Sequence, residues 1–159
     1  MVLAFSGGLD TSFCVPWLKD QGWEVHTAFV DTGGTSAPGL DAVRCQAMAV
    51  GAARHHLIDA RQTVYRRFIR YLIQGNMLRG EVYPLSVAAE RTQQATSVIE
   101  LARQLDSDAV AHGSTGAGND QVRFDVAFRV LAPDLDILTP IRDEGLTREQ
   151  AIAYLTERS

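Results

Sequence analysis

Residues 2–14 read VLAFSGGLDTSFC, and this stretch decides the fold class. Its first four residues, 2–5, are apolar and predict a strand that is buried on both faces, as strands of parallel sheets are. The two glycines predict a tight turn, and the apolar spacing after them predicts a helix over residues 11–21 that Thr11 or Asp10 caps. A strand, a glycine turn and a helix in that order form the first unit of an α/β fold.

The same alternation of strands and helices continues to the end of the chain. Four further strands are predicted at residues 24–30, 54–58, 108–112 and 136–141. Further helices are predicted at residues 40–50, 64–73 and 87–105, after residue 119, and at 147–158 with Thr147 as the cap. The predicted fold is therefore a doubly wound α/β domain, with a mostly parallel, five-stranded sheet and helices on both faces. Ligands of such sheets bind beyond the carboxyl ends of the strands.

The composition suits one layered domain in the cytoplasm. The 159 residues, 46% of them apolar, can bury one core, so residues 1–159 are expected to form a single domain. The net charge of -4 argues against non-specific binding to nucleic acid or to an anionic membrane. No stretch approaches the roughly 20 apolar residues that span a bilayer. Cys14 and Cys45 lie in apolar helical patterns and are expected to be buried, inert thiols.

The glycine turn after the first strand has the chemistry of a phosphate site. Backbone N–H groups at a turn that leads into a helix form a cup of partial positive charge, and the hydroxyls of Ser6, Thr11 and Ser12 surround it. A Walker A loop would need a lysine after its glycines, but the only lysine of the chain is Lys19. The turn is therefore either a plain tight turn or an anion site in which Asp10 meets the phosphates through a magnesium ion.

A second glycine segment, HGSTGAGNDQVRF at residues 112–124, repeats this arrangement after the fourth strand. It is either a glycine turn before a capped helix or a site for a small zwitterion. In the second case Arg123 grips a carboxylate, Asp120 takes an ammonium group, and Thr115 and Asn119 orient both.

The histidines carry little signal of a metal site. His26, His55 and His56 have no cysteine or carboxylate partners at ligand spacing and are expected to be ordinary structural or surface residues. His112 comes immediately before the second glycine turn, where it could orient the loop or approach a phosphate.

The two glycine segments carry a family resemblance. SGGLDTS at residues 6–12 resembles the pyrophosphate-binding loop of the N-type ATP pyrophosphatases, whose fold is adenine nucleotide alpha hydrolase-like. HGSTGAGNDQVRF closely resembles the aspartate- and citrulline-binding segment of the argininosuccinate synthases. Together with AFSGGLDTSFC at residues 4–14 and YPLSVAAER at residues 83–91, the likeness runs in order over essentially the whole chain.

The resemblance implies an ATP-dependent ligase of arginine biosynthesis. It implies that the ureido oxygen of citrulline attacks the α-phosphate of ATP, so that pyrophosphate leaves and a citrullyl adenylate forms. The amine of aspartate then displaces AMP and gives argininosuccinate. ATP and Mg2+ are the implied cofactors, and citrulline and aspartate are the implied small-molecule partners.

The resemblance also implies roles for individual residues. Those implied to bind ATP are Ala4, Phe5, Ser6, Gly7, Gly8, Leu9, Asp10, Thr11, Ser12, Val30 and Gly113. Those implied to bind aspartate are Thr115, Asn119 and Asp120, and those implied to bind citrulline are Tyr83, Asn119 and Arg123. Asp10, Asp120 and Arg123 are the implied catalytic residues, with Asp10 near the metal ion.

The resemblance sets expectations for the surroundings of the domain. Members of the family are longer, so a C-terminal synthetase domain is expected outside residues 1–159, together with the arm that makes the family homo-oligomeric. Two alternatives stay open: a domain that binds ATP without completing the reaction, and a tRNA-modifying thiolase built on the same loop. The thiolase would need a reactive cysteine near the site and a basic RNA-binding face.

Overall fold

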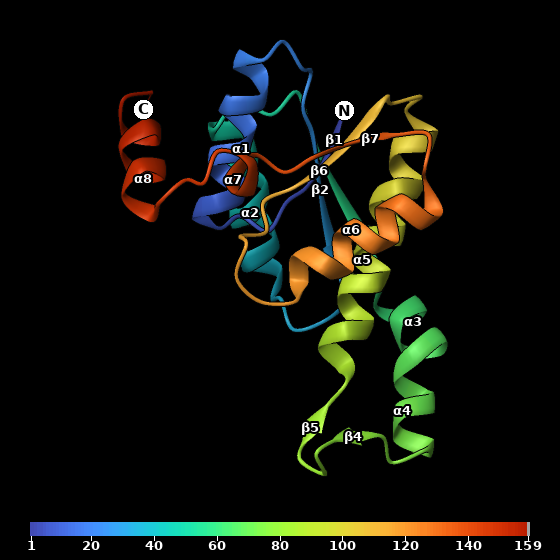
Figure 1. Ribbon diagram of the computed structural model, residues 1–159. Helices are drawn as coiled ribbons and strands as arrows, with labels where there is room; N and C mark the ends of the chain where they lie inside the picture. The colour runs from blue at the N-terminus through green and yellow to red at the C-terminus, as the bar shows by residue number, and fades with distance from the viewer. Residues whose placement is uncertain (159) are drawn as a thin grey trace.

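One sheet organises the computed structural model, which describes residues 1–158 and the side chains of all of them except Arg79, Tyr83 and Pro84. The sheet joins β1 (Val2–Ala4), β2 (His26–Asp31), β3 (Arg54–Asp59), β6 (Ala109–His112) and β7 (Asp136–Leu138) in the order β3-β2-β1-β6-β7 (Figure 1). Every pairing in it is parallel. The predicted doubly wound, five-stranded sheet is confirmed. The strand order reverses at β1, which is where ligands of such sheets bind.

Helices cover both faces of the sheet, as predicted. One face carries α5 (Ser86–Gln104) and α6 (Asp120–Leu131), and the other carries α1 (Leu9–Asp20), α2 (Ala37–Ala49) and α7 (Pro140–Asp143) (Figure 1). Helix α8 (Arg148–Thr156) packs on the outer side of α1. Neighbouring residues of β1 belong to different cores: Val2 packs with Phe128 of α6, whereas Leu3 packs with Phe13 of α1. This alternation explains why the strand is apolar throughout.

Two helices begin earlier than predicted. Helix α1 begins at Leu9, and its N-cap residue is Gly8, so the prediction that Asp10 or Thr11 caps it is wrong. Both residues already lie in the first helical turn, where a side chain can no longer occupy the cap position. Helix α2 begins at Ala37 because the Ser36 hydroxyl accepts a hydrogen bond from a backbone N–H of its first turn. The predicted cap of the last helix is confirmed, since Thr147 forms a capping box.

The region between β3 and α5 forms an arm that stands away from the sheet (Figure 1). Its helical part consists of α3 (Arg61–Val64), a π-helical turn η1 (Tyr65–Ile69) and α4 (Arg70–Gln74), followed by a small hairpin of β4 (Leu78–Arg79) and β5 (Tyr83–Pro84). The sequence predicts one regular helix and no hairpin here. The apolar spacing of residues 64–73 predicts one packed face with Val64, Phe68, Tyr71 and Leu72. Tyr71 is nevertheless 53% exposed, because the arm packs mainly on α5.

The structure bears on the predictions that both cysteines are buried and that no segment spans a membrane. Cys14 is buried, as predicted, but Cys45 is exposed on α2, so the prediction of two buried thiols is wrong for Cys45. Only Ala47 of α2 is fully buried, and the other faces of that helix meet solvent. No helix within residues 1–158 has the length and apolar character needed to cross a bilayer.

Removal of one core ring tests the packing of α6 on the sheet. Phe128 is fully buried and packs edge-on against Phe124 at 5.7 Å between ring centroids. Phe128→Ala is expected to lower the free energy of unfolding by about 3–5 kcal/mol, because it leaves a cavity. Urea denaturation measures this loss. The control Val130→Ala, on the same helix but 70% exposed, should stay within about 0.5 kcal/mol; equal losses in both variants would contradict this packing.

Candidate active-site cleft

The turn between β1 and α1 has a conformation that its glycines allow. Gly7 has a φ of +80°, and a Cβ atom there would lie 3.1 Å from Val43 Cγ2. The hydroxyls on the two sides of the turn meet, with 3.2 Å between Ser6 Oγ and Thr11 Oγ1. The Gly8 N–H donates to Ser6 Oγ at 3.3 Å. The positive φ and the contact with Val43 explain why a glycine stands at residue 7, and the two hydroxyls hold the turn in this conformation.

The first turn of α1 faces this cleft, and its N-cap residue, Gly8, offers no side chain to cap it. Among the side chains that the structure describes, none accepts a hydrogen bond from the first N–H groups of the helix. These N–H groups have no partners within the helix, and they carry the positive end of the helix dipole. An anion is the ligand that such a helix end favours.

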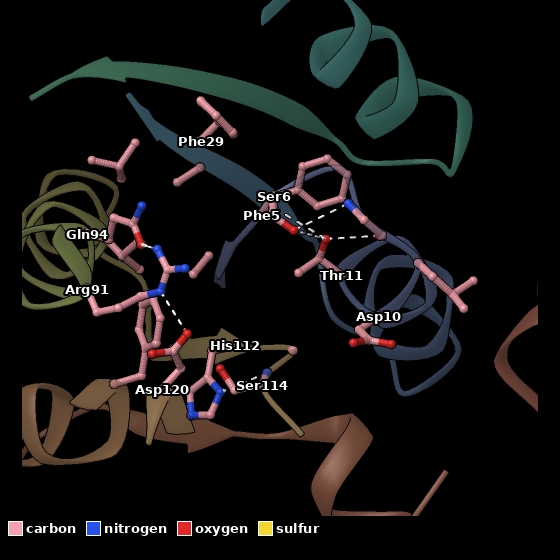
Figure 2. Close-up of a pocket in the computed structure, with 18 residues that line it drawn as sticks. Phe5, Ser6, Asp10, Thr11, Phe29, Arg91, Gln94, His112, Ser114 and Asp120 are labelled. Carbon is pink, nitrogen blue, oxygen red and sulfur yellow. Dashed lines mark hydrogen bonds and ion pairs between the residues drawn. The ribbon is translucent and has the colours of Figure 1, made fainter. Parts of the chain in front are cut away.

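The cleft lies at the carboxyl ends of β1, β2 and β6 and has a volume of about 240 Å³ (Figure 2). Nine of the eleven residues predicted to bind ATP line it: Ala4, Phe5, Ser6, Gly8, Leu9, Asp10, Thr11, Val30 and Gly113. Gly7 and Ser12 do not. The Ser12 hydroxyl is buried behind the turn and accepts a hydrogen bond from Gln46 Nε2 at 3.3 Å. ATP binding by these residues stays a prediction.

Gly113 joins the second glycine segment to the first. A Cβ atom at this position would lie 3.1 Å from Thr11 Cγ2 and 3.3 Å from the Thr11 backbone nitrogen. The loop after β6 can therefore touch the first turn of α1 only because residue 113 has no side chain. This contact brings together two segments that are about a hundred residues apart in the sequence.

Asp120 stands between the cleft and a second cavity. It lines the cleft and also a wide cavity of about 690 Å³, whose other walls include Val87, Asn119 and Arg123. Asp120 Oδ1 lies 2.6 Å from Arg123 Nη1, and its Oδ2 lies 3.0 Å from Arg91 Nε. Burial raises the pKa of the Asp120 carboxyl, but the hydrogen bonds from the two guanidinium groups outweigh burial and leave that pKa below its usual range.

The predicted amino-acid-binding residues are only partly brought together. Asn119, Asp120 and Arg123 line the wide cavity, whereas Thr115 is exposed and lines neither cavity. Tyr83 lies in β5, but its side chain is outside the described part of the chain. Nothing in the structure tests aspartate or citrulline binding.

The structure adds cleft residues that sequence reasoning missed. Arg91 and Gln94 reach the cleft from α5, Phe29 reaches it from β2, and Ser114 follows β6 (Figure 2). Arg91 belongs to the segment YPLSVAAER, whose wording supported the family resemblance but gave this arginine no role. The packing of α5 on the sheet places Arg91 opposite the glycine turn at residues 6–8.

His112 fixes the second glycine loop through a hydrogen bond with the loop backbone. Its Nδ1 accepts a hydrogen bond from the Ser114 N–H at 3.2 Å, so the ring proton lies on Nε2 and is donated to Asp125 Oδ1 at 2.9 Å. Arg142 of α7 binds the other Asp125 oxygen at 2.6 Å. Burial lowers the pKa of His112, and the hydrogen bond with Asp125 offsets only part of that shift. His112 therefore orients the loop as a neutral ring.

The residues present fit a magnesium ion that is bound mainly through phosphates. The Asp10 carboxylate lines the cleft, and no hydrogen bond to it occurs within the described part of the chain. Among the described side chains there is no cluster of three histidine, cysteine or carboxylate ligands. Mg2+ commonly takes one or two carboxylates and completes its shell with phosphate oxygens and water. Asp10 is suited to that arrangement.

A comparison with known families decides which family this cleft belongs to. A family model described as "Arginosuccinate synthase N-terminal HUP domain" matches residues 1–159. The chain belongs to the argininosuccinate synthase family. The resemblance predicted from SGGLDTS and HGSTGAGNDQVRF is confirmed. A tRNA-modifying thiolase is not favoured, and burial raises the pKa of the Cys14 thiol to about 12, so this cysteine near the turn stays protonated.

Curated argininosuccinate synthases match nearly all of the chain. The protein from Staphylococcus haemolyticus is 44% identical over 154 residues, and the one from Pyrobaculum aerophilum is 46% identical over 155 residues; each alignment covers 97% of this chain. The one from Lactiplantibacillus plantarum is 42% identical over 159 residues. The chain spans 38% of the length of each of these relatives.

Solved structures support the fold. An NH3-dependent NAD synthetase from Campylobacter jejuni aligns over 99% of this chain and 62% of its own, with a TM-score of 0.65 and 13% identity. A protein described as a predicted subunit of tRNA methyltransferase, from Methanocaldococcus jannaschii, aligns over 98% of this chain and 73% of its own, with a TM-score of 0.63 and 17% identity. At these identities the likeness concerns the fold alone.

The close approach at Gly113 can be tested by adding a methyl group. Gly113→Ala is expected to lower the free energy of unfolding by about 1–3 kcal/mol, because the new Cβ atom would press on the first turn of α1. Gly116→Ala is the matched control in the same loop, since its Cβ atom would have no neighbour within 4 Å. Chemical denaturation compares the two variants, and a loss that is no larger for residue 113 would rule out the close contact.

The buried imidazole of His112 predicts a pH dependence of stability. Its pKa in the folded protein is lowered, so its contribution is complete above its ordinary value of about 6.5 and is lost as the pH falls through the folded pKa. The difference in unfolding free energy between the wild type and His112→Gln should therefore shrink between pH 7 and pH 5. Urea titrations at both pH values measure this, and taking the difference cancels the contributions of His55 and His56. A constant difference would refute the prediction.

Proposed function

We propose that this chain is the ATP-binding part of an argininosuccinate synthase, which joins citrulline to aspartate at the expense of ATP. One observation carries the proposal: the two glycine segments characteristic of the family meet at one cleft, and Asp120 lines both this cleft and the adjoining cavity. A nucleotide in the cleft and an amino acid in the cavity would then adjoin at Asp120.

In the proposed reaction the protein mainly positions its substrates. The ureido oxygen of citrulline attacks the α-phosphate of ATP, the bond to the β-phosphate breaks, and pyrophosphate leaves. The amine of aspartate then attacks the carbon of the resulting citrullyl adenylate, and AMP leaves. Neither step needs a protein nucleophile, so orientation and stabilisation of phosphate charge account for most of the catalysis.

The proposed roles of the residues follow the two cavities. The turn at residues 6–12 and the first turn of α1 bind the pyrophosphate end of ATP, and Val30 contacts the adenine side. Thr115, Asn119 and Asp120 bind aspartate. Tyr83, Asn119 and Arg123 bind citrulline. The free carboxylate of Asp10 would hold Mg2+, which when bound neutralises phosphate charge.

Asp10, Asp120 and Arg123 are proposed as the catalytic residues. The ion pairs of Asp120 with Arg91 and Arg123 support this role, because they hold its carboxylate ionised where an ammonium group would bind. Arg123 keeps further guanidinium N–H groups for a substrate carboxylate, since only its Nη1 is paired with Asp120.

We also propose how this domain works with the rest of its family. Residues 1–159 would form one ATP-binding domain of a cytoplasmic homo-oligomer, and the remaining length of the relatives would supply the synthetase domain. The net charge of -4 supports small-molecule partners over nucleic acid or membranes. A second candidate, in which this chain binds ATP but does not turn over alone, is separated from the first by the experiment below.

Pyrophosphate release tests the proposal. The chain is mixed with Mg-ATP, citrulline and aspartate, and each amino acid is then omitted in turn. Release that requires citrulline supports the ligase. ATP binding without release supports the second candidate, and release that ignores both amino acids would refute the synthase.

Replacement of the free carboxylate tests the role of Asp10. Asp10→Asn is expected to weaken binding of Mg-ATP at least about tenfold, the loss of one charged ligand. Binding of ATP without magnesium should be unchanged or tighter, because a negative charge leaves the cleft. Calorimetry with and without EDTA measures both affinities. Asp41→Asn, at an exposed position on α2, is the control; a loss that is equal with and without magnesium would exclude a metal role for Asp10.

A further inference from the structure

The glycine turn at residues 6–8 lacks the lysine that P-loops use in addition to magnesium, and phosphate sites commonly hold such a cationic side chain. Among the side chains described as lining the cleft, Arg91 is the one cationic group, because His112 is held neutral. We infer that Arg91, from the opposite wall of the cleft, is the residue that binds the phosphates of the nucleotide as the missing cation. This inference rests on the proposed ATP-binding function and adds a residue to it.

The two walls of the cleft come from opposite faces of the sheet. The turn and the first residues of α1 form one wall, and Arg91 on α5 forms the other, since α1 and α5 pack in different cores. The guanidinium group points into the cleft between Asp120 and the glycine turn at residues 6–8 (Figure 2). An anion on the first turn of α1 would therefore have the helix dipole on one side and a full positive charge on the other.

Arg91 is oriented before any ligand arrives. Its Nε donates to Asp120 Oδ2 at 3.0 Å, and its Nη1 donates to Gln94 Oε1 at 3.0 Å. Within the described part of the chain, Nη2 has no hydrogen-bond partner. Two edges of the guanidinium are thus fixed by the protein, and its remaining N–H groups are free for phosphate oxygens. Fixed donors bind an anion with less loss of side-chain entropy than a mobile side chain would.

The carboxylates near Arg91 do not outnumber the guanidinium groups. Asp120 is shared between Arg91 and Arg123, so two guanidinium groups face one carboxylate. With the Asp10 carboxylate included, two guanidinium groups balance two carboxylates around the cleft and the second cavity. The side chain of Arg91 keeps 30% of its exposure, which leaves it accessible to a ligand.

A purely structural role for Arg91 makes different predictions. If Arg91 only held Asp120 in place, loss of either partner would disturb the cleft in the same way, and every ligand of the cleft would bind less well. If Arg91 binds phosphate, its loss would affect only ligands that carry phosphate. Loss of the Asp120 carboxylate would then leave ATP binding unchanged or make it tighter.

Calorimetric titration of the chain with ATP and with adenosine separates these cases. Arg91→Met is expected to weaken ATP binding roughly ten- to hundredfold, as the loss of a charge-assisted hydrogen bond does, and to leave adenosine binding unchanged. Arg91→Lys should fall between this variant and the wild type, because lysine keeps the charge without the planar fork. The matched control is Arg103→Met on the same helix, where the arginine pairs with Asp134 outside the cleft.

Each outcome bears on the inference. Unchanged ATP binding by Arg91→Met, or equal losses for ATP and adenosine, would overturn it. A loss of ATP affinity in Asp120→Asn as large as that in Arg91→Met would also overturn it, because a purely structural role of the Arg91–Asp120 ion pair would then explain both losses. A wild-type chain that does not bind ATP at all would overturn the proposed function as well. A wild-type chain that binds ATP, together with an Arg91→Met variant of unchanged ATP affinity, would overturn this inference alone.

Discussion

The parallel pairing of β1 with β6 is the contact on which the rest of the site depends. The register sets Ala4 opposite His112, so the glycine turns that follow these residues leave the sheet at the same edge. Gly113 then lets the second turn rest on the first turn of α1. A Cβ atom at that position would lie within 3.1–3.3 Å of the first turn of α1, so one strand register and one missing Cβ atom bring the two family segments together.

The charged and polar groups of the cleft come from both faces of the sheet. At the glycine turn, the cleft has a helix terminus without a side-chain cap and no lysine in the loop. Arg91 and Asp120 belong to helices on the other face of the sheet, and their ion pair joins the two cavities. His112 contributes no positive charge, because burial keeps it neutral while its ring fixes the loop. One wall therefore presents the N-terminus of α1 and the other presents the Arg91–Asp120 ion pair, and the sheet fixes their relative positions.

Sequence reasoning succeeded where the signal is local. Apolar runs and helical spacing predicted the five strands and the helices on both faces, because burial on two faces leaves a plain pattern in the residues. It failed at helix starts, where Gly8 and Ser36 act as cap positions, and in the arm, where β4 and β5 pair over only two residues each. Cys45 was placed in the core because its helix pattern is apolar, although that face of α2 meets solvent.

The sequence by itself determined the fold class, the family and the position of the glycine turn after β1, since strand periodicity, glycine positions and short motifs are properties of neighbouring residues. Only the tertiary structure decided which side chains share the cleft. Arg91 and Gln94 lie on the same helix as Arg103, and although Arg91 ends the segment YPLSVAAER, no local pattern shows that its side chain reaches a cleft. What distinguishes them is the place where α5 crosses the carboxyl edge of the sheet, which depends on packing between segments far apart in the chain.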